Sequence, residues 1–161
     1  MMLHKVILKG IALDPTTNSP IVILKGENDK SIIPIWIGIF EAHSIISELE
    51  RVEPPRPMTH DLMKNILEKL DIKIEKVIID DLNNNTFFAT IYLSQDEKTI
   101  TIDSRPSDAI AIAIRADSPI YVSSLVLEKS AINLSENQKS EDALKSILEQ
   151  MSPEDFGKYE M

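Results

Sequence analysis

Three short segments place acidic, basic and histidine side chains beside strongly apolar runs. They span residues 34–42, 55–62 and 102–109, and each lies where a strand is expected to end or a helix to begin. Helix starts present unpaired backbone N–H groups and the positive end of the helix dipole, which favours the binding of phosphate or carboxylate groups. The three segments are therefore candidates for one anion-binding or catalytic site.

The residue types in these segments fit metal-assisted hydrolysis of a phosphodiester bond. Such a reaction needs carboxylates to hold Mg²⁺ or Mn²⁺, cations to neutralise the phosphate, and a base for the attacking water. The metal-ligand candidates are Glu41, Asp103 and Asp108, the phosphate-binding candidates are Arg56, Arg105 and Arg115, and the catalytic candidates are His60, Asp61, Asp103 and Asp108. The sequence thus offers a candidate for every role.

The same residues also have ordinary structural explanations. Asp61 and Asp108 fall in the first turns of expected helices, where an acid stabilises the helix by roughly 0.3–1 kcal/mol. Asp103 and Arg105 are two positions apart, so they could share a strand face and form an ion pair. A lone histidine at a helix start, such as His60, is more often structural than catalytic. Taken singly, these acids favour helix capping, and the Asp103–Arg105 pair leaves both interpretations open.

Composition restricts the classes of protein to which the chain can belong. Its 161 residues suit one compact domain, and no apolar run approaches the roughly 18 residues that cross a bilayer. Cysteine is absent, which excludes disulfides, thiolate zinc sites and cysteine nucleophiles. We expect a cytoplasmic protein without a signal peptide or membrane contact. The net charge of −9 repels phosphate backbones, so a nuclease would need clustered arginines or bound divalent cations.

The hydrophobic pattern predicts an α+β fold built on a mixed, largely antiparallel sheet. Runs of apolar residues separated by turn-forming residues predict an N-terminal three-stranded meander. The expected strands cover residues 4–13, 20–25, 31–37, 73–80, 86–93, 99–103 and 120–127, and the expected helices cover residues 41–50, 59–70 and 106–115. Two or three helices should pack on this sheet. Trp36 lies in an apolar strand, where core packing is favoured over stacking against a base.

The segment from residue 106 to 115 alternates like a strand but begins like a helix. Pro106 suits a first helical turn, Asp108 suits the helix dipole, and the turn formers of residues 117–119 would end the element. A helix that is apolar on every side must be buried. We therefore predict a buried helix.

The chain divides by composition near residue 127. Residues 1–127 should form the domain, while residues 128–161 form an acidic tail in which residues 142–151 could make one amphipathic helix. No long internal repeat is present.

The three polar segments, in this order and spacing, resemble the signature of the bifunctional nuclease family. The resemblance covers about residues 6–127, and its most distinctive stretch is Arg-Pro-Ser-Asp-Ala-Ile-Ala at residues 105–111. Members of that family are described as degrading both DNA and RNA, and the resemblance implies nucleic acid as the substrate. It carries no residue roles with it.

Two hypotheses follow from the sequence. One is a divalent-metal-assisted nuclease that acts on DNA and RNA. The alternative is a non-catalytic, oligomeric ligand-binding or protein-interaction module, in which the polar segments are architectural. We also expect a homo-oligomer, because exposed edge strands and Ile-rich faces tend to associate.

Overall fold

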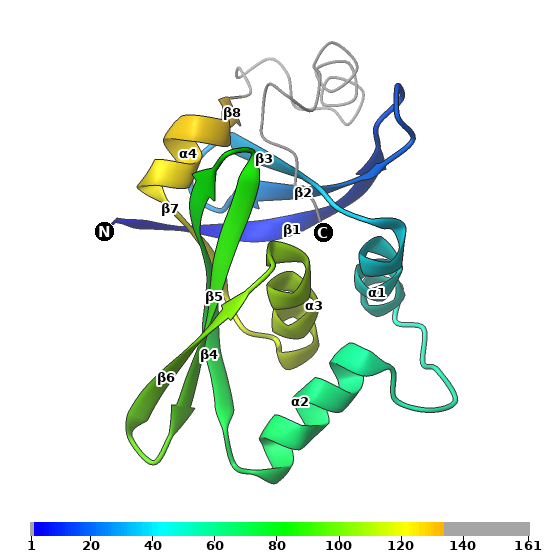
Figure 1. Cartoon of the computed structure of the whole chain (residues 1–161), viewed down its shortest axis with the longest axis vertical. Helices are drawn as coiled ribbons and strands as arrows, with labels where there is room; N and C mark the ends of the chain where they lie inside the picture. Colours follow the sequence, from blue (N-terminus) through cyan, green and yellow to red (C-terminus); the bar gives the residue numbers. More distant parts are fainter. Residues whose placement is uncertain (1, 134–161) are drawn as a thin grey trace.

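The structure, a computed structural model, describes residues 2–133 (Figure 1). Within these residues one sheet of eight strands has the order β6-β5-β4-β7-β1-β2-β3-β8. The strands are β1 Leu3–Leu13, β2 Pro20–Gly26, β3 Ser31–Trp36, β4 Lys73–Asn83, β5 Thr86–Gln95, β6 Lys98–Ser104, β7 Ile120–Ser123 and β8 Ile132–Asn133. Neighbouring strands are antiparallel except β4 and β7, which are parallel. The predicted α+β class and its mixed, largely antiparallel sheet are confirmed.

The N-terminal meander is formed by β1, β2 and β3, as predicted. A buried hydrogen bond closes it, because the indole Nε1 of Trp36 donates to Asp14 Oδ2 at 2.9 Å. Asp14 also accepts hydrogen bonds from the backbone N–H groups of Thr16 and Thr17, which fixes the turn after β1. Trp36 is 1% exposed, so its assignment to the core rather than to base stacking is confirmed.

Three helices form a layer around the middle of the sheet. They are α1 Ile39–Leu49, α2 Thr59–Lys69 and α3 Pro106–Ala116. In Figure 1, α3 lies in the angle between β4–β5 and β1–β2–β3, and it contacts α1, α2, β4 and β5. Its apolar residues 109–113 are all buried, as the pattern predicted. Asp117 adopts the left-handed conformation at φ 55° and ends the helix.

The expected strand over residues 120–127 is wrong in its second half. Strand β7 ends at Ser123, and helix α4, Ser124–Ser130, follows at once. The hydroxyl of Ser123 accepts a hydrogen bond from Val126 N at 3.2 Å, so Ser123 is the N-cap residue that ends the strand and starts the helix. The β-branched and apolar residues on both sides of Ser123 hid this change.

Helix α4 crosses residue 127, and β8 then pairs with β3. The predicted helix over residues 142–151 lies outside the described residues. None of the helices in residues 2–133 is long and apolar enough to cross a membrane.

Candidate active site

A cleft of about 990 Å³ opens where α1, α2 and α3 meet. One wall is α1, and the opposite wall is the proline-rich connector of residues 52–58 together with the start of α2. Prolines 54, 55 and 57 exclude a regular helix there, so the chain crosses between α1 and α2 as a stiff, open loop. The first and last turns of α3 complete the lining. The topology thus brings residues from all three sequence segments to one place, as predicted.

A chain of hydrogen bonds centred on His60 crosses the cleft from α1 to α3. The Oγ of Ser44 lies 2.7 Å from His60 Nδ1, and His60 Nε2 lies 2.9 Å from Asp108 Oδ1. On the far side of Asp108, Arg105 Nε donates to Oδ2 at 2.9 Å. Three helices therefore contribute one residue each to a Ser44–His60–Asp108 chain, which we call the His60 relay.

The charge on Asp108 determines how protons are arranged in the His60 relay. Hydrogen bonding to His60 outweighs burial and, with help from Arg105, lowers the pKa of Asp108 to about 2. At neutral pH this carboxylate is ionised and only accepts hydrogen bonds, so His60 Nε2 must carry the proton between them. In the neutral ring Nδ1 is then an acceptor, and Ser44 donates its hydroxyl proton to it.

Arg115 connects the same three helices from beneath the cleft. Its Nε donates to Asp61 Oδ1 at 2.8 Å, its Nη1 to Ala111 O at 2.9 Å, and its Nη2 to Ser44 O at 2.9 Å. Only 5% of the Arg115 side chain is exposed. The guanidinium is therefore held by protein oxygens, and the geometry gives Arg115 an architectural position rather than a phosphate-binding one.

Asp61 caps the start of α2 and also pairs with Arg115. Its Oδ2 accepts a hydrogen bond from Met58 N at 2.9 Å, which is the helix-capping arrangement expected for an acid in the first turn. Burial raises the pKa of Asp61, but the hydrogen bonds from Met58 and Arg115 more than offset this, so the pKa lies below its usual range. Both carboxylate oxygens of Asp61 are used within the fold.

Glu41 lies beside the His60 relay and has one buried oxygen to spare. Its Oε1 is 3.6 Å from Arg105 Nη1, whereas its Oε2 has no hydrogen-bond partner in the described part of the chain. A buried carboxylate oxygen without a partner is costly, so this atom is the one place in the cleft that calls for an added donor or cation.

Two of the predicted site residues stand apart from the His60 relay. Arg56 lines the cleft from the proline-rich connector and is exposed, and within residues 2–133 it forms no ion pair. Asp103 is exposed on β6 opposite Thr90, and the cleft lining does not include it. The predicted clustering therefore holds for Glu41, His60 and Asp108 and does not extend to Asp103.

Ser44 is the site residue that sequence reasoning missed. It lies in mid-helix, where serine carries no motif, and only the packing of α1 against the start of α2 gives it a partner. A usable signal was present nevertheless. Residues 41, 44 and 48 recur at helical spacing and place polar side chains on one stripe of α1.

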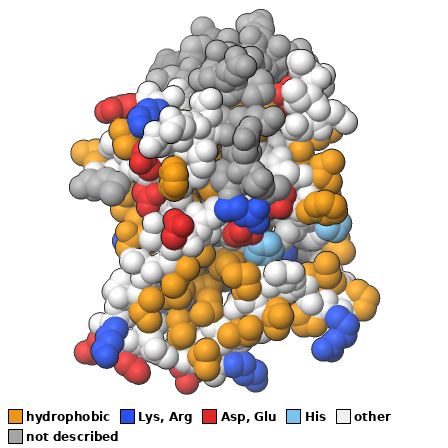
Figure 2. Space-filling model, viewed as in Figure 1, with side chains coloured by type: hydrophobic (Ala, Val, Ile, Leu, Met, Phe, Trp, Pro, Cys, Tyr) orange, Lys and Arg blue, Asp and Glu red, His pale blue; other side chains and the backbone are white. Residues whose placement is uncertain are grey.

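The cleft is negative overall. Among its described lining residues are the carboxylates of Glu41, Glu48, Glu50, Glu53, Asp61 and Asp108, against the guanidinium groups of Arg56, Arg105 and Arg115. Six acids thus face three arginines, two of which are already paired. Figure 2 shows acidic, basic and histidine side chains side by side in the middle of this face of the molecule.

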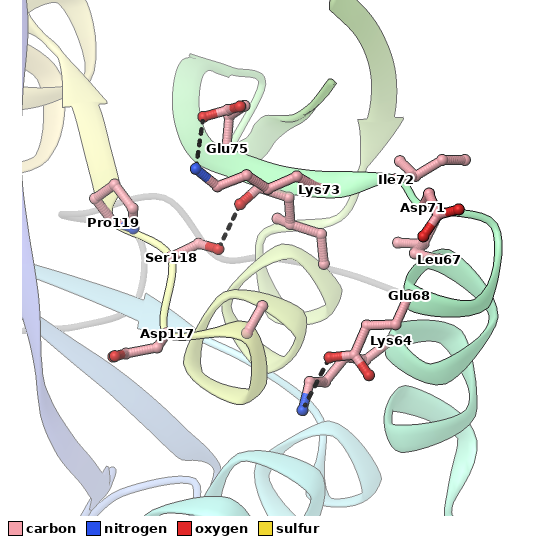
Figure 3. Close-up of a pocket in the computed structure, with 12 residues that line it drawn as sticks. Lys64, Leu67, Glu68, Asp71, Ile72, Lys73, Glu75, Asp117, Ser118 and Pro119 are labelled. Carbon is pink, nitrogen blue, oxygen red and sulfur yellow. Dashed lines mark hydrogen bonds and ion pairs between the residues drawn. The ribbon is translucent and has the colours of Figure 1, made fainter. Parts of the chain in front are cut away.

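A second hollow, of about 520 Å³, lies between the end of α2, the start of β4 and the turn before β7 (Figure 3). Its charges are paired locally, Lys64 with Glu68 at 3.4 Å and Lys73 with Glu75 at 3.7 Å. It is lined by two lysines and four carboxylates and contains no histidine. This hollow therefore lacks the arginine and histidine side chains that line the cleft.

The fold and cleft define an α+β domain in which three helices assemble a histidine–carboxylate–arginine site. A family model for the bifunctional nuclease domain matches residues 22–135. The chain belongs to this family. The match contains all three polar segments and both ends of the His60 relay.

Relatives fall into two groups. A protein of Mycobacterium tuberculosis whose function is uncharacterised is 35% identical over 157 residues, which cover 91% of this chain and 94% of that protein. Bifunctional nuclease 1 of Oryza sativa subsp. japonica is 24% identical over 136 residues, and bifunctional nuclease 2 of Arabidopsis thaliana is 27% identical over 108 residues. These segments cover 83% and 65% of this chain but only 41% and 33% of the plant proteins.

Replacing Arg115 with methionine should lower the free energy of unfolding by about 3 kcal/mol. This is the lower end of the range for a broken buried ion pair, because Asp61 keeps partial contact with water. Urea unfolding measures the change, with Arg51→Met, an exposed arginine on the loop after α1, as the control. A loss of less than about 1 kcal/mol would mean that the ion pair between Arg115 and Asp61 contributes no more than a solvent-exposed salt bridge, which would contradict the prediction.

The low pKa of Asp108 predicts a defined pH dependence of stability. Above about pH 5 the carboxylate is charged in the folded and unfolded states, so its stabilising contribution is complete. As the pH falls from the ordinary value of 3.8 to about 2, the unfolded chain takes up the proton first and the contribution is lost. The stability difference between the wild type and Asp108→Asn should therefore shrink between pH 4 and pH 2. Asp96→Asn, in the exposed β5–β6 turn, controls for the change of charge.

Proposed function

We propose that this chain is a nuclease that hydrolyses phosphodiester bonds of DNA and RNA in the cleft between α1, α2 and α3. The His60 relay is the observation that carries the proposal. A histidine held by an ionised carboxylate on one nitrogen and free to accept a proton on the other is the arrangement of a general base. The family, and the names of the plant relatives, support nucleic acid as the substrate.

In this proposal Arg56 binds the substrate phosphate and His60 acts as the general base. Arg56 lines the cleft without an ion pair in the described chain, so its guanidinium can make a bidentate contact with phosphate oxygens. Arg105 holds Asp108 and Glu41 and so keeps the relay in place. Asp61 and Arg115 position Ser44 and the start of α2, where His60 lies.

The divalent cation predicted from the sequence stays a prediction. The described residues contain no group of three or more histidine, aspartate or glutamate side chains that could hold a metal ion. Asp108 already uses both oxygens, and Glu41 offers one. A cation bound by Asp108 would have to displace His60 or Arg105, whereas one at Glu41 Oε2 would displace neither, and no step of the reaction is assigned to it. We also propose a cytoplasmic location, which is supported by the absence of cysteine from the sequence.

Cleavage of labelled single- and double-stranded DNA and RNA by chelator-treated protein tests the nuclease. His60→Gln should lower the rate at least about 100-fold, the usual contribution of a general base, while the protein stays folded by circular dichroism. Asp96→Asn is the control variant, because it lies in the β5–β6 turn and does not line the cleft.

Each arm of this assay decides one point. If no substrate is cut with or without Mg²⁺ or Mn²⁺, the nuclease proposal fails. If the wild type and His60→Gln cut equally, the activity comes from another site or from a contaminant. A rate that is the same with chelator and with added cation contradicts the cation prediction alone.

We further propose that the chain forms a homo-oligomer through α2 and the sheet edge at β6. Although α2 is amphipathic, it has no buried residue, and its apolar side chains Leu62, Met63 and Ile66 are 40–52% exposed. Strand β6 ends the described sheet and exposes Ile100 and Ile102. Figure 2 shows apolar side chains gathered over the region that β6 and α2 occupy in Figure 1.

A second copy of the chain is the occupant that fits this surface. An isologous contact would pair one β6 edge with the other and bury both apolar faces at once. The alternative function, a non-catalytic interaction module, would rest on this same surface.

Light scattering coupled to size-exclusion chromatography measures the assembly. The wild type should elute with a mass above that of the monomer, and Ile66→Glu, which places a charge in the apolar face of α2, should return it to the monomer. Lys69→Glu introduces the same side chain on the polar face and should not dissociate the assembly. A monomeric wild type at every concentration tested contradicts the proposal.

A further inference from the structure

Ser44 behaves differently from the other serine that α1 presents to the cleft. Serine in a helix interior commonly returns its hydroxyl hydrogen bond to the carbonyl one turn earlier, and Ser47 does so with His43 O at 2.8 Å. Ser44 instead directs its Oγ to His60 Nδ1 at 2.7 Å. Both residues line the cleft. One turn apart on α1, Ser47 thus bonds to its own helix backbone, whereas Ser44 bonds to a side chain of α2.

The direction of the proton in this hydrogen bond makes Ser44 an activated hydroxyl. His60 Nε2 carries a proton because Asp108, which is ionised, can only accept. In the neutral ring His60 Nδ1 then faces Ser44 as an acceptor, and removal of the Ser44 proton would give an imidazolium ion held against a carboxylate. This is the arrangement of roles that defines a nucleophile, its base and the group that orients the base.

The surroundings of the His60 relay match such a role. His60 has 13% of its side chain exposed, so water has limited access to the proton path. Arg105 Nε donates a hydrogen bond to the second oxygen of Asp108 and so restrains that carboxylate. Arg115 binds the carbonyl oxygen of Ser44 itself, which fixes the backbone from which the hydroxyl projects. The three members come from three helices, and each is held by a further contact.

We propose that Ser44 Oγ is the nucleophile of the cleft, with His60 as its base and Asp108 as the residue that positions His60. The proposal rests on the nuclease function proposed above and deepens it. The Ser44 proton passes to His60 Nδ1, the Oγ–P bond forms, and the bond from phosphorus to the leaving nucleoside oxygen breaks on the side opposite Ser44, where that oxygen takes a proton from solvent water. Water then attacks phosphorus and gives up a proton to solvent, the Oγ–P bond breaks, and Ser44 recovers its proton from His60.

The net reaction is water plus phosphodiester to phosphomonoester plus alcohol, and it requires no further reactant. Arg56, at the rim of the cleft, is the cation available to the phosphate oxygens during both steps. The covalent intermediate distinguishes this route from direct attack by water on the substrate, for which Ser44 would only orient His60.

An uncharged alkyl fluorophosphonate tests Ser44 directly, because the negative cleft does not repel it. The wild-type protein should gain one covalent phosphonyl group, which peptide mass spectrometry should locate on Ser44. Ser47→Ala should react at the wild-type rate, Ser44→Ala should not react, and Asp108→Asn should react at least about 100-fold more slowly. Circular dichroism melting confirms that each variant is folded. Because the position of the adduct is read in the wild type, the test does not depend on the folding of any variant.

The proposal is overturned if the folded wild type gains no adduct on Ser44, if Ser47 reacts equally, or if a folded Asp108→Asn reacts at the wild-type rate. The nuclease assay tests the nuclease function separately from the role of Ser44 as nucleophile. If Ser44→Ala still cleaves nucleic acid, the nuclease proposal stands and Ser44 is not the nucleophile. If Ser44 forms the adduct but the protein cleaves no nucleic acid, Ser44 is a reactive serine and the nuclease proposal fails.

Discussion

The buried guanidinium of Arg115 is the contact on which the geometry of the cleft depends. It is charged, nearly excluded from water, and satisfied by one oxygen from each of three helices. A buried charge must be paired and hydrogen-bonded, so the three helices are constrained to approach one another at this point and in one arrangement. Because two of its partners are Asp61 and the carbonyl of Ser44, the same contact sets the distance from Ser44 to the start of α2. The His60 relay is thus a consequence of where Arg115 must be.

The position of Arg115 follows in turn from the burial of α3. That helix is apolar around its middle and can be stable only when enclosed by the sheet on one side and by α1 and α2 on the other. Its polar residues are confined to its ends, where Arg105 and Asp108 face the cleft and Arg115 closes the last turn. Because the polar residues lie at the two ends of one rigid helix, Asp108 and Arg115 are held about two helical turns apart. The buried middle of the helix keeps this separation fixed.

Much of the fold could be predicted because its signals are local. The alternation of apolar residues gave β1 to β6, and the proline, first-turn acid and terminal turn formers gave α3. The break at Ser123 was missed because an N-cap serine between two apolar runs looks like the interior of a strand. The site was predictable only in part. Helix starts and acid–base residue types identified His60 and Asp108, whereas their pairing with Ser44 joins residues 44, 60 and 108, which no sequence pattern connects. Asp103 was included through its closeness in sequence to Arg105, although it is exposed on β6 and does not line the cleft.

The charges of the cleft bear on how its chemistry can operate. Sequence reasoning counted acids as potential metal ligands, but in the folded chain most of them are partners of arginine or histidine. Asp61 and Asp108 have no oxygen to spare, and the negative surroundings oppose the approach of a polyanion. A cation bound at Asp108 would release His60 or Arg105 from that carboxylate, whereas Glu41 has one oxygen without a partner. A neutral nucleophile whose proton is removed internally adds no charge to the cleft. The hydrogen bonds that occupy both oxygens of Asp108 also orient His60 toward Ser44, so the two properties follow from one network.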